Sequence, residues 1–539
     1  MTKRLNRVGL TIIAFIGLLC MIFLTGMVWR YTVRRFTYGE LLIEKDSLGA
    51  NLLCFILAVF LAYGIYKIFG ILKQKTIHIM GILLALVLIG GMFFLIEEAS
   101  ATAIVADQAQ IIYGAEWLLD GRYEDIYNYP YFRVYSYQLQ VSKFFGEIIH
   151  LFGKPVWESL KLLQYINAVC VGITFYVGMC ITWKSFKDVR MEGVYLLLAV
   201  LFAPMYIYAL FIYGEAMGVC GAVLAIYFYI LIRQKEQQKK RQAILYWAGM
   251  ALCLWIAYLL RSGLIIVWIA IFIIEFLSCL RWKSWWRILC VLAVLVGVLG
   301  GQRLFYHSIE EKTGLSIDKG APVVYLCVAM GMQGGEEVAD NPGSYNGYNW
   351  VTFTENEYNV EASIEQAKAD IYRRFSELIA QPERMFRFYK SKILNQWAEP
   401  SYSAFSSTCV MSEPAEWVID YWYNEEHDFL YNFLNRYQSI VYLLLLVYFF
   451  RLFLKKESEG IYLQGLVFIG GFLFSVIWEA QSRYTYPYIV IAIPCMAAGM
   501  KCCIDGVELL IRKVRTSVQR VDKFGSKLPM PDLQPGIKE

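Results

Sequence analysis

The stretch from Ile77 to Ile96 reads IHIMGILLALVLIGGMFFLI and decides the fold of this chain. It contains no Asp, Glu, Lys or Arg, and it has the roughly 20 residues that a helix needs to cross a hydrocarbon core. The whole chain follows the same trend, because 58% of its 539 residues are hydrophobic and only 18% are charged. Soluble domains carry about 25% charged residues, so the composition predicts an integral membrane protein.

Similar apolar stretches recur along the sequence and predict about twelve membrane spans. The fold class that they indicate is an all-α polytopic membrane protein. The predicted spans cover residues 8–29, 49–70, 77–96, 158–182, 192–208, 213–232, 243–260, 262–280, 286–304, 437–454, 461–478 and 484–503.

Basic residues predict the orientation of the spans, because cytoplasmic loops carry an excess of Lys and Arg. If every span crosses once, most basic loops share one side, which we expect to be cytoplasmic together with both termini. The net charge of +5 is therefore a topology signal and does not indicate nucleic-acid binding. Arg30, Arg34 and Arg35 depart from the rule and fall on the outer side. The basic residues that agree include Lys3, Arg4, Arg7, Lys73, Lys75, Lys184, Lys187, Arg190, Arg281, Lys283, Arg287, Arg512, Lys513 and Arg515.

Two outer regions, 97–157 and 305–436, are too long to be simple connections. In the first, apolar residues recur at helical spacing over 104–119 and 135–152, which predicts two amphipathic helices lying in the membrane interface. The aromatic cluster between these helices is either an interfacial belt or a surface that stacks on sugars. Its members are Tyr123, Tyr127, Tyr129, Tyr131, Phe132, Tyr135 and Tyr137.

The second outer region combines Gly- and Asn-rich turns with helical patterns at 364–379 and 382–397. It predicts a small extracytoplasmic loop domain whose basic face meets either solvent or an anionic lipid group. The predicted organisation is an N-terminal end with two additional spans (1–76), a membrane module (77–304), the loop domain (305–436), C-terminal spans (437–503) and a basic cytoplasmic tail (504–539).

Charged residues at the outer ends of the spans are the candidates for a functional site, because charge near hydrocarbon is costly. Asp107, Glu215, Arg261, Glu479 and Arg483 all map to the outer side. Simpler explanations exist, since Asp107 fits a helix cap and Arg261 fits snorkelling at the interface. Glu479 and Arg483 fit an ion pair within one helical turn.

The functional interpretation of Arg483 is a phosphate ligand oriented by Glu479. A guanidinium suits phosphate because it forms charge-assisted, often bidentate hydrogen bonds. Residues from such distant stretches make one site only if the fold brings them together. We therefore expect Asp107 and Arg483 to border one cavity.

With these residues the chain resembles the GT-C superfamily of membrane glycosyltransferases, and most closely the bacterial relatives of the protein O-mannosyltransferases (family 39-like). The stretch Ala106–Gly121, which holds Asp107, is similar to that family's catalytic loop. Tyr135–Leu139 resembles its following Tyr-Pro motif, with Ser in place of Pro. Tyr213–Glu215 resembles a Tyr-Gly-acid motif, and Glu479–Tyr484 resembles the Arg-Tyr motif that opens a late span.

The resemblance implies a GT-C-like fold in a bacterial cell membrane and an active site on the extracytoplasmic face. It implies transfer of a sugar from a polyprenyl-phosphate donor to a hydroxyl of a glycan, lipid or protein acceptor, by an inverting mechanism. Asp107 would be the general base, and Arg483, Arg261 and Tyr484 would bind the donor phosphate. The residues that it implies for substrate binding are Gln108, Tyr137, Gln138, Tyr213, Glu215 and Glu479.

Many relatives have Glu where this chain has Gln108, so one potential carboxylate ligand is absent and the need for a divalent metal stays unknown. Two other functions fit the topology. A polymerase or ligase of lipid-linked glycans would use a diphosphate-linked donor. A transporter or lipid flippase predicts charges deep within spans and helices broken at mid-membrane, whereas the charges considered above lie at span ends.

Overall fold

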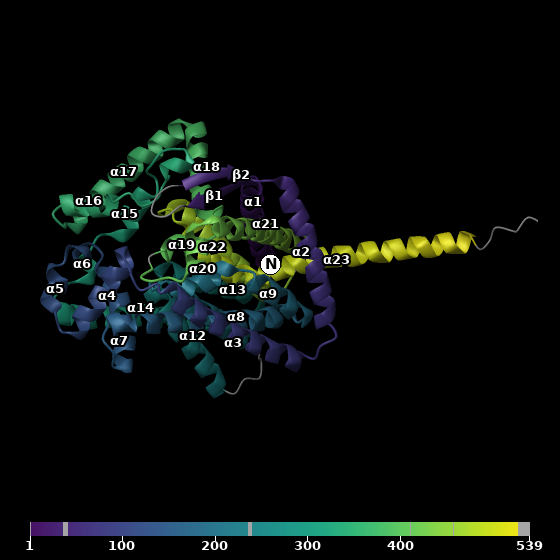
Figure 1. Cartoon of the computed structure of the whole chain (residues 1–539), viewed down its shortest axis with the longest axis horizontal. Coiled ribbons are helices and arrows are strands. Elements are labelled where there is room, and N and C mark those ends of the chain that lie inside the picture. Colours follow the sequence, from purple (N-terminus) through teal and green to yellow (C-terminus); the bar gives the residue numbers. More distant parts are fainter. Residues whose placement is uncertain (1, 36–40, 235–239, 410, 456, 526–539) are drawn as a thin grey trace, which may run out of the picture.

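The computed structural model describes residues 2–35, 41–234, 240–409, 411–455 and 457–525, and these residues are almost entirely helical (Figure 1). The sheet structure in this part of the chain is one antiparallel hairpin, formed by β1 (Tyr31–Arg35) and β2 (Leu41–Lys45). Residues 526–539 of the predicted tail lie outside the described residues.

Eleven described helices are long and apolar enough to cross a membrane, and a bent pair of helices makes a twelfth crossing if it counts as one span. The predicted all-α polytopic fold is therefore confirmed, and each predicted stretch overlaps one crossing. The straight crossings are α1 (Thr2–Val28), α2 (Leu48–Phe69), α3 (Gln74–Ala99), α8 (Leu160–Phe186), α11 (Glu215–Gln234), α12 (Lys240–Leu260), α13 (Ile265–Trp282), α14 (Trp285–Thr313), α21 (Glu425–Leu454), α22 (Leu463–Ile477) and α23 (Tyr486–Gly525).

The predicted span 192–208 is broken into α9 (Arg190–Val200) and α10 (Ala203–Ile207), and the two parts meet at a bend of 67°. Pro204 accounts for the break, because proline lacks the N–H that would bond the carbonyl four residues earlier, whereas it is tolerated in the first turn of a helix, where it stands in α10. Tyrosine hydroxyls satisfy two carbonyls next to the break: Tyr437 donates to Leu198 at 2.7 Å and Tyr206 donates to Ala199 at 2.8 Å. The break is thus compatible with a buried position.

The two long outer regions gather at one end of the bundle, which we call the site end (Figure 1). The amphipathic helices expected at 104–119 and 135–152 correspond to α4 (Ala106–Leu119) and α7 (Leu139–Phe152), which pack against each other. Two short helices between them, α5 (Tyr123–Asn128) and α6 (Pro130–Val134), carry much of the aromatic cluster. The loop region contains α15 (Val323–Met330), α16 (Tyr348–Glu355), α17 (Val360–Ala380), α18 (Pro382–Trp397), α19 (Ala404–Ser407) and α20 (Glu416–Tyr423).

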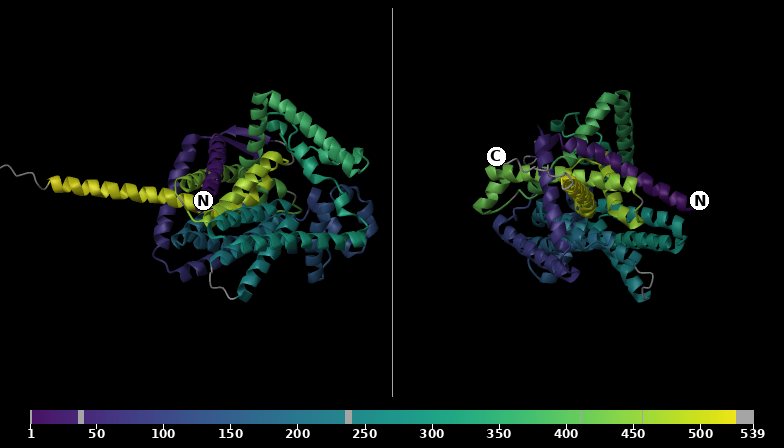
Figure 2. Two further views of the ribbon diagram at one scale, coloured as in Figure 1. Left: turned by 180° about the vertical axis from the view of Figure 1, so that it is seen from behind. Right: turned by 90° about the vertical axis from the view of Figure 1, so that its right-hand side faces the viewer.

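The last helix differs from the expectation of a separate tail after residue 503. α23 continues without interruption to Gly525, and its second half projects from the body on the side away from α15–α17 (Figures 1 and 2). The start of the chain also lies away from the site end. There, at the opposite end, Asn6 donates to the Leu277 carbonyl at 2.7 Å. A buried ion cluster joins helices at this opposite end, because Arg233 lies 3.3 Å from Glu275 and 2.9 Å from Glu459.

The β1–β2 hairpin follows the first span and is bound to the site end. The Val33 N–H donates to the Ala398 carbonyl at 2.9 Å, and the Tyr431 hydroxyl donates to the Val33 carbonyl at 2.5 Å. Arg34 lies 3.2 Å from Glu44 on the other strand and also pairs with Asp428. These contacts place the last residue of β1, Arg35, beside the cavity described next.

Candidate functional site

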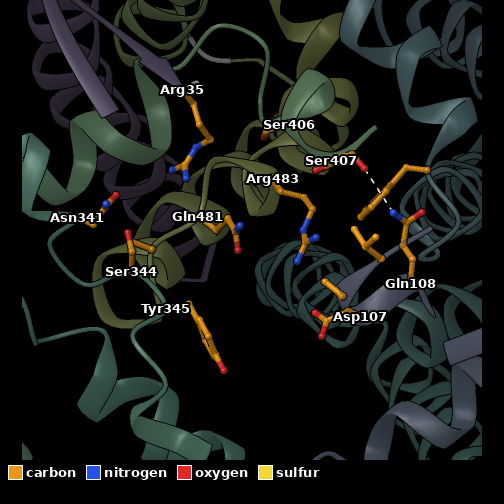
Figure 3. Close-up of a pocket in the computed structure, with 14 residues that line it drawn as sticks. Arg35, Asp107, Gln108, Asn341, Ser344, Tyr345, Ser406, Ser407, Gln481 and Arg483 are labelled. Atoms are coloured by element: carbon orange, nitrogen blue, oxygen red, sulfur yellow. Dashed lines mark hydrogen bonds between the residues drawn. The ribbon is translucent and has the colours of Figure 1, made fainter. Parts of the chain in front are cut away.

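A cavity of about 320 Å³ at the site end is lined by residues from widely separated segments (Figure 3). We call it cavity A. Asp107, from the first turn of α4, and Arg483, from the 3-10 turn Ser482–Tyr484, both line it. The juxtaposition expected of these two residues is therefore present. The other polar side chains of cavity A include Arg35, Gln108, Ser344, Tyr345 and Gln481.

Asp107 does not cap its helix. The N-cap position is Val105, so the capping interpretation is wrong, and the carboxylate instead accepts two tyrosine hydroxyls. Tyr131 donates to Oδ1 and Tyr213 donates to Oδ2, each at 3.0 Å. A helix N-terminus favours a carboxylate, and each carboxylate oxygen keeps a second lone pair for another donor. Asp107 is thus oriented and able to accept a further hydrogen bond.

The residue before Asp107 has an unusual backbone conformation. Ala106 has φ of 50°, in the left-handed region that costs a non-glycine residue roughly 1–2 kcal/mol. Such conformations persist only where the surroundings enforce them, and they cluster at functional sites. Here the conformation starts α4 so that Asp107 points into cavity A (Figure 3).

The two tyrosines that hold Asp107 are themselves fixed. Gln138 Nε2 donates to the Tyr213 hydroxyl at 2.7 Å, which leaves that hydroxyl's own proton for Asp107. Burial is the main cause that raises the pKa of Tyr131 well above its usual value, so this phenol stays protonated. Tyr131 belongs to the predicted aromatic cluster, but its contact with Asp107 was not anticipated. The cluster therefore folds inward at this position instead of forming only an interfacial belt.

Arg483 pairs with Glu215. Its Nε lies 3.5 Å from Glu215 Oε1, and Arg261 pairs with the same carboxylate. Both guanidiniums also lie over the Tyr213 ring, with Cζ at 4.1 Å for Arg261 and 5.0 Å for Arg483. Glu215 is 2% exposed and lines neither cavity A nor the second cavity described below. The structure thus makes Glu215 a holder of two arginines, which differs from the expected contact with substrate.

The backbone conformation between Tyr213 and Glu215 requires a glycine, Gly214. Its φ is 100°, a conformation that side-chain-bearing residues rarely adopt, and an added Cβ would lie 3.2 Å from Leu260 Cβ. The turn directs the preceding tyrosine toward Asp107 and the following carboxylate toward the two arginines.

Glu479 makes no ion pair within 4.0 Å of Arg483, because the helix expected to join them is absent, and the charge of Arg483 acts on it only at longer range. α22 ends at Ile477, and the next residues turn so that the Ala480 N–H donates to the Gly343 carbonyl at 2.7 Å. Glu479 is 6% exposed, and burial raises its pKa to about 7. Lys392 lies within electrostatic reach; it is fully buried, and burial lowers its pKa to about 7. Lys392 donates to the carbonyls of Gly331 at 2.6 Å and Val476 at 3.0 Å.

A second cavity of about 170 Å³, which we call cavity B, is lined by Tyr213, the tyrosine that donates to Asp107. It has apolar walls such as Leu264 and Phe474, between the start of α13 and the end of α22. Apart from Glu215, the predicted site residues therefore divide between two cavities, with Asp107, Gln108 and Arg483 in cavity A. Those in cavity B are Tyr137, Gln138, Tyr213, Arg261, Glu479 and Tyr484.

Gln108 clamps three segments together. Its Oε1 accepts from the Ile212 N–H at 2.9 Å and its Nε2 donates to the Ser407 carbonyl at 3.4 Å (Figure 3), a donation that a carboxylate cannot make. In the described ranges, no group of three or more His, Cys, Asp or Glu residues is placed to hold a metal ion. Asp107 is the one carboxylate among the described residues that line cavity A, so the residues present do not fit a metal held by protein ligands alone.

Arg35 is one of the site residues that the sequence did not indicate. It lines cavity A from the hairpin, and its Nε has no hydrogen-bond partner among the described residues. The signal that could have found it is its departure from the positive-inside rule, since an arginine on the outer side needs another reason to be there.

Comparison with known proteins places the chain in a family. No curated protein and no solved structure matches it. A family model described as "conserved hypothetical integral membrane protein" matches residues 8–498, a range that contains every residue lining the two cavities. The match covers most of the chain, which therefore belongs to this family of conserved hypothetical integral membrane proteins.

Proposed function

We propose that the protein is a membrane glycosyltransferase that moves a sugar from a polyprenyl-phosphate donor to an acceptor hydroxyl on the extracytoplasmic face. The observation that carries this proposal is the meeting of Asp107 and Arg483 at cavity A. A positioned carboxylate can take a proton from an attacking hydroxyl. A buried guanidinium can stabilise the negative charge that develops on a leaving phosphate. An inverting sugar transfer needs both.

The reaction proposed is a single displacement at the anomeric carbon. The acceptor oxygen forms the new bond to that carbon while its proton passes to a free lone pair of the Asp107 carboxylate. The bond from the anomeric carbon to the phosphate oxygen breaks, and its electron pair leaves on the polyprenyl phosphate. Tyr131 and Tyr213 hold the base in place, with hydroxyls 3.0 Å from its oxygens.

The two adjoining cavities suit the two parts of such a donor. We assign the lipid end to cavity B, because its walls combine apolar side chains with Arg261 and Tyr484. The sugar would occupy cavity A, most of whose lining residues are polar and include the proposed base. The phosphate would then lie near Arg483 and Arg261, whose shared contact with Glu215 and Tyr213 fixes both guanidiniums at the boundary.

A transporter is the second candidate, because the break between α9 and α10 is a feature of many transporters. In those proteins the broken segment borders the substrate. Here Phe202, at the break, is fully buried, and neither cavity A nor cavity B is lined by residues 201–202. The transferase accounts for more of the described site.

The test is to incubate the purified protein with a panel of polyprenyl-phosphate sugars and acceptors and to measure polyprenyl phosphate by mass spectrometry. The proposal expects release that requires an acceptor and shows saturation with donor. A parallel panel of diphosphate-linked glycans tests the polymerase or ligase alternative. Release from the diphosphate panel alone, or from neither panel, would contradict the proposed donor class.

A further inference from the structure

Cavity A contains an arginine that the proposed chemistry does not use. Arg35 enters the cavity from the end of β1, and its guanidinium points toward Asn341 and Gln481 (Figure 3). In the same view Arg483 lies between Arg35 and Asp107, so Arg35 lies at the end of the cavity away from the proposed base.

The charge of Arg35 is not neutralised by contact. In the described part of the chain no carboxylate lies within 4.0 Å of it, whereas neighbouring Arg34 pairs with both Glu44 and Asp428. Burial is the main cause that lowers the pKa of Arg35, and the charge of Arg483 lowers it further. An arginine nevertheless stays protonated in proteins, so a desolvated cation remains at this end of the cavity.

The anion that acts on Arg35 from a distance is already occupied. Glu399 partly raises the pKa of Arg35, but its carboxylate accepts hydrogen bonds from Ser401 N–H at 2.9 Å and from Ser403 N–H at 2.5 Å. The Tyr431 hydroxyl, whose proton is shared with the closer Val33 carbonyl, lies 3.2 Å from the same carboxylate. Glu399 therefore holds its own loop and does not cover the guanidinium.

A second unpartnered polar group lies in the same cavity. The Ser344 hydroxyl is buried and has no hydrogen-bond partner among the described residues, as is also true of Arg35 Nε. Buried polar atoms without partners are costly, at roughly 1–3 kcal/mol each. A ligand that accepts hydrogen bonds from both would remove that cost, and an anionic oxygen group suits a guanidinium best.

We propose that cavity A selects substrates that carry an anionic group, a phosphate or a carboxylate, and that Arg35 and Ser344 bind this group. The inference rests on the proposed function, because the anionic group would belong either to the transferred sugar or to the acceptor. An uncharged substrate leaves the Arg35 guanidinium desolvated and unpaired. Such a substrate therefore binds more weakly than an anionic one.

The test measures binding of matched charged and neutral probes to the detergent-solubilised full chain by calorimetry. Glucuronate against glucose represents an acidic sugar, and glycerol 3-phosphate against glycerol represents a phosphate-bearing acceptor. One charged probe should bind at least about tenfold more tightly than its neutral partner, and that probe identifies the source of the anionic group. Arg35→Gln should abolish the preference, and Ser344→Ala should reduce it severalfold.

Arg30→Gln is the matched control, because Arg30 is exposed just before the same hairpin and should leave the preference unchanged. Arg35→Lys keeps the charge and should retain part of the preference, which separates a binding role from a folding role. Equal affinity for charged and neutral probes, or a full preference in Arg35→Gln, would overturn the inference. Sugar transfer without any charge preference would refute the role of Arg35 alone. Charge preference without any transfer would refute the proposed function alone.

Discussion

At the scale of single residues, two tyrosine hydroxyls position Asp107. Two phenols reach its two oxygens from different segments, and one of these phenols also stacks under the arginines that would hold a phosphate. Tyr213 is therefore the residue that connects the proposed base to the proposed leaving-group site. Its hydroxyl and its ring can be tested separately.

Tyr213→Phe removes the hydroxyl and keeps the ring. A hydrogen bond to a charged group contributes about 1.5–3 kcal/mol, so we expect kcat for sugar transfer to fall roughly 10- to 100-fold. KM for the donor should change little, because both arginines keep their aromatic surface. Tyr127→Phe is the control, since Tyr127 is 52% exposed and should leave kcat unchanged. Wild-type kcat in Tyr213→Phe would refute the connecting role.

The raised pKa of Glu479 leads us to predict that the stability of the protein depends on pH. This pKa is about 7 in the folded protein against 4.5 for an ordinary glutamate, so between these values the folded state holds a proton that the unfolded state has lost. The contribution of Glu479 to the stability of the wild type should fall as pH rises from 4.5 to 7, by on the order of 3 kcal/mol. Glu479→Gln cannot ionise, so its advantage in thermal unfolding should grow over this range and level off above pH 7. An advantage that does not change with pH would contradict this account.

The sequence indicated most of the charged residues of the site, but it did not indicate which of them form ion pairs with each other. Asp107 and Arg483 stand out because charges are rare beside apolar stretches. The partner of Arg483 depends on where α22 ends, and sequence spacing wrongly favoured Glu479 four positions away. Arg35 was missed because a short polar segment between two spans gives no apolar signal from which a hairpin can be inferred.

At the scale of elements, the turn at Gly214 sets the direction of two site residues. Gly214→Ala introduces a Cβ 3.2 Å from Leu260 in a backbone conformation with φ of 100°. We expect a loss of roughly 1–3 kcal/mol in stability and a larger loss of transfer activity, because Tyr213 and Glu215 would both shift. Differential scanning fluorimetry and the transfer assay measure the two effects.

Gly64→Ala is the matched substitution for that experiment. Gly64 lies inside α2, and an added Cβ meets nothing within 4 Å. Alanine favours helix by up to about 1 kcal/mol over glycine, so this variant should be unchanged or slightly more stable, with full activity. Equal behaviour of the two variants would show that the turn has no special role.

Long elements were predictable because a helix in a membrane must satisfy its own backbone and therefore needs a long apolar stretch. Every expected span overlaps a crossing, and the predicted helix over 382–397 has the same bounds as α18. The break before Pro204 was missed because 193–208 contains no charged residue, and hydropathy does not report backbone continuity. The helical nature of 504–525 was missed because its basic residues suggested a tail.

At the scale of the whole molecule, the arrangement predicts which parts of the chain share a side of the membrane. Ala369 is exposed on α17 at the site end, and Lys75 is exposed at the start of α3. In intact cells we expect a membrane-impermeant maleimide to label Ala369→Cys, while Lys75→Cys should be labelled only after permeabilisation. The parent chain with its own cysteines provides the background. Labelling of both positions from outside would contradict the expected topology.

The central claim is that Asp107 removes the acceptor proton, and single-turnover transfer by Asp107→Asn tests it most directly. Asparagine keeps the shape and one acceptor oxygen but cannot take the proton, so transfer should fall by at least about 10²-fold while donor affinity stays within a few-fold. Asp125→Asn is the control, because Asp125 is a half-exposed aspartate of the same outer region whose carboxylate pairs with Arg122. Near-normal transfer by Asp107→Asn would contradict the account.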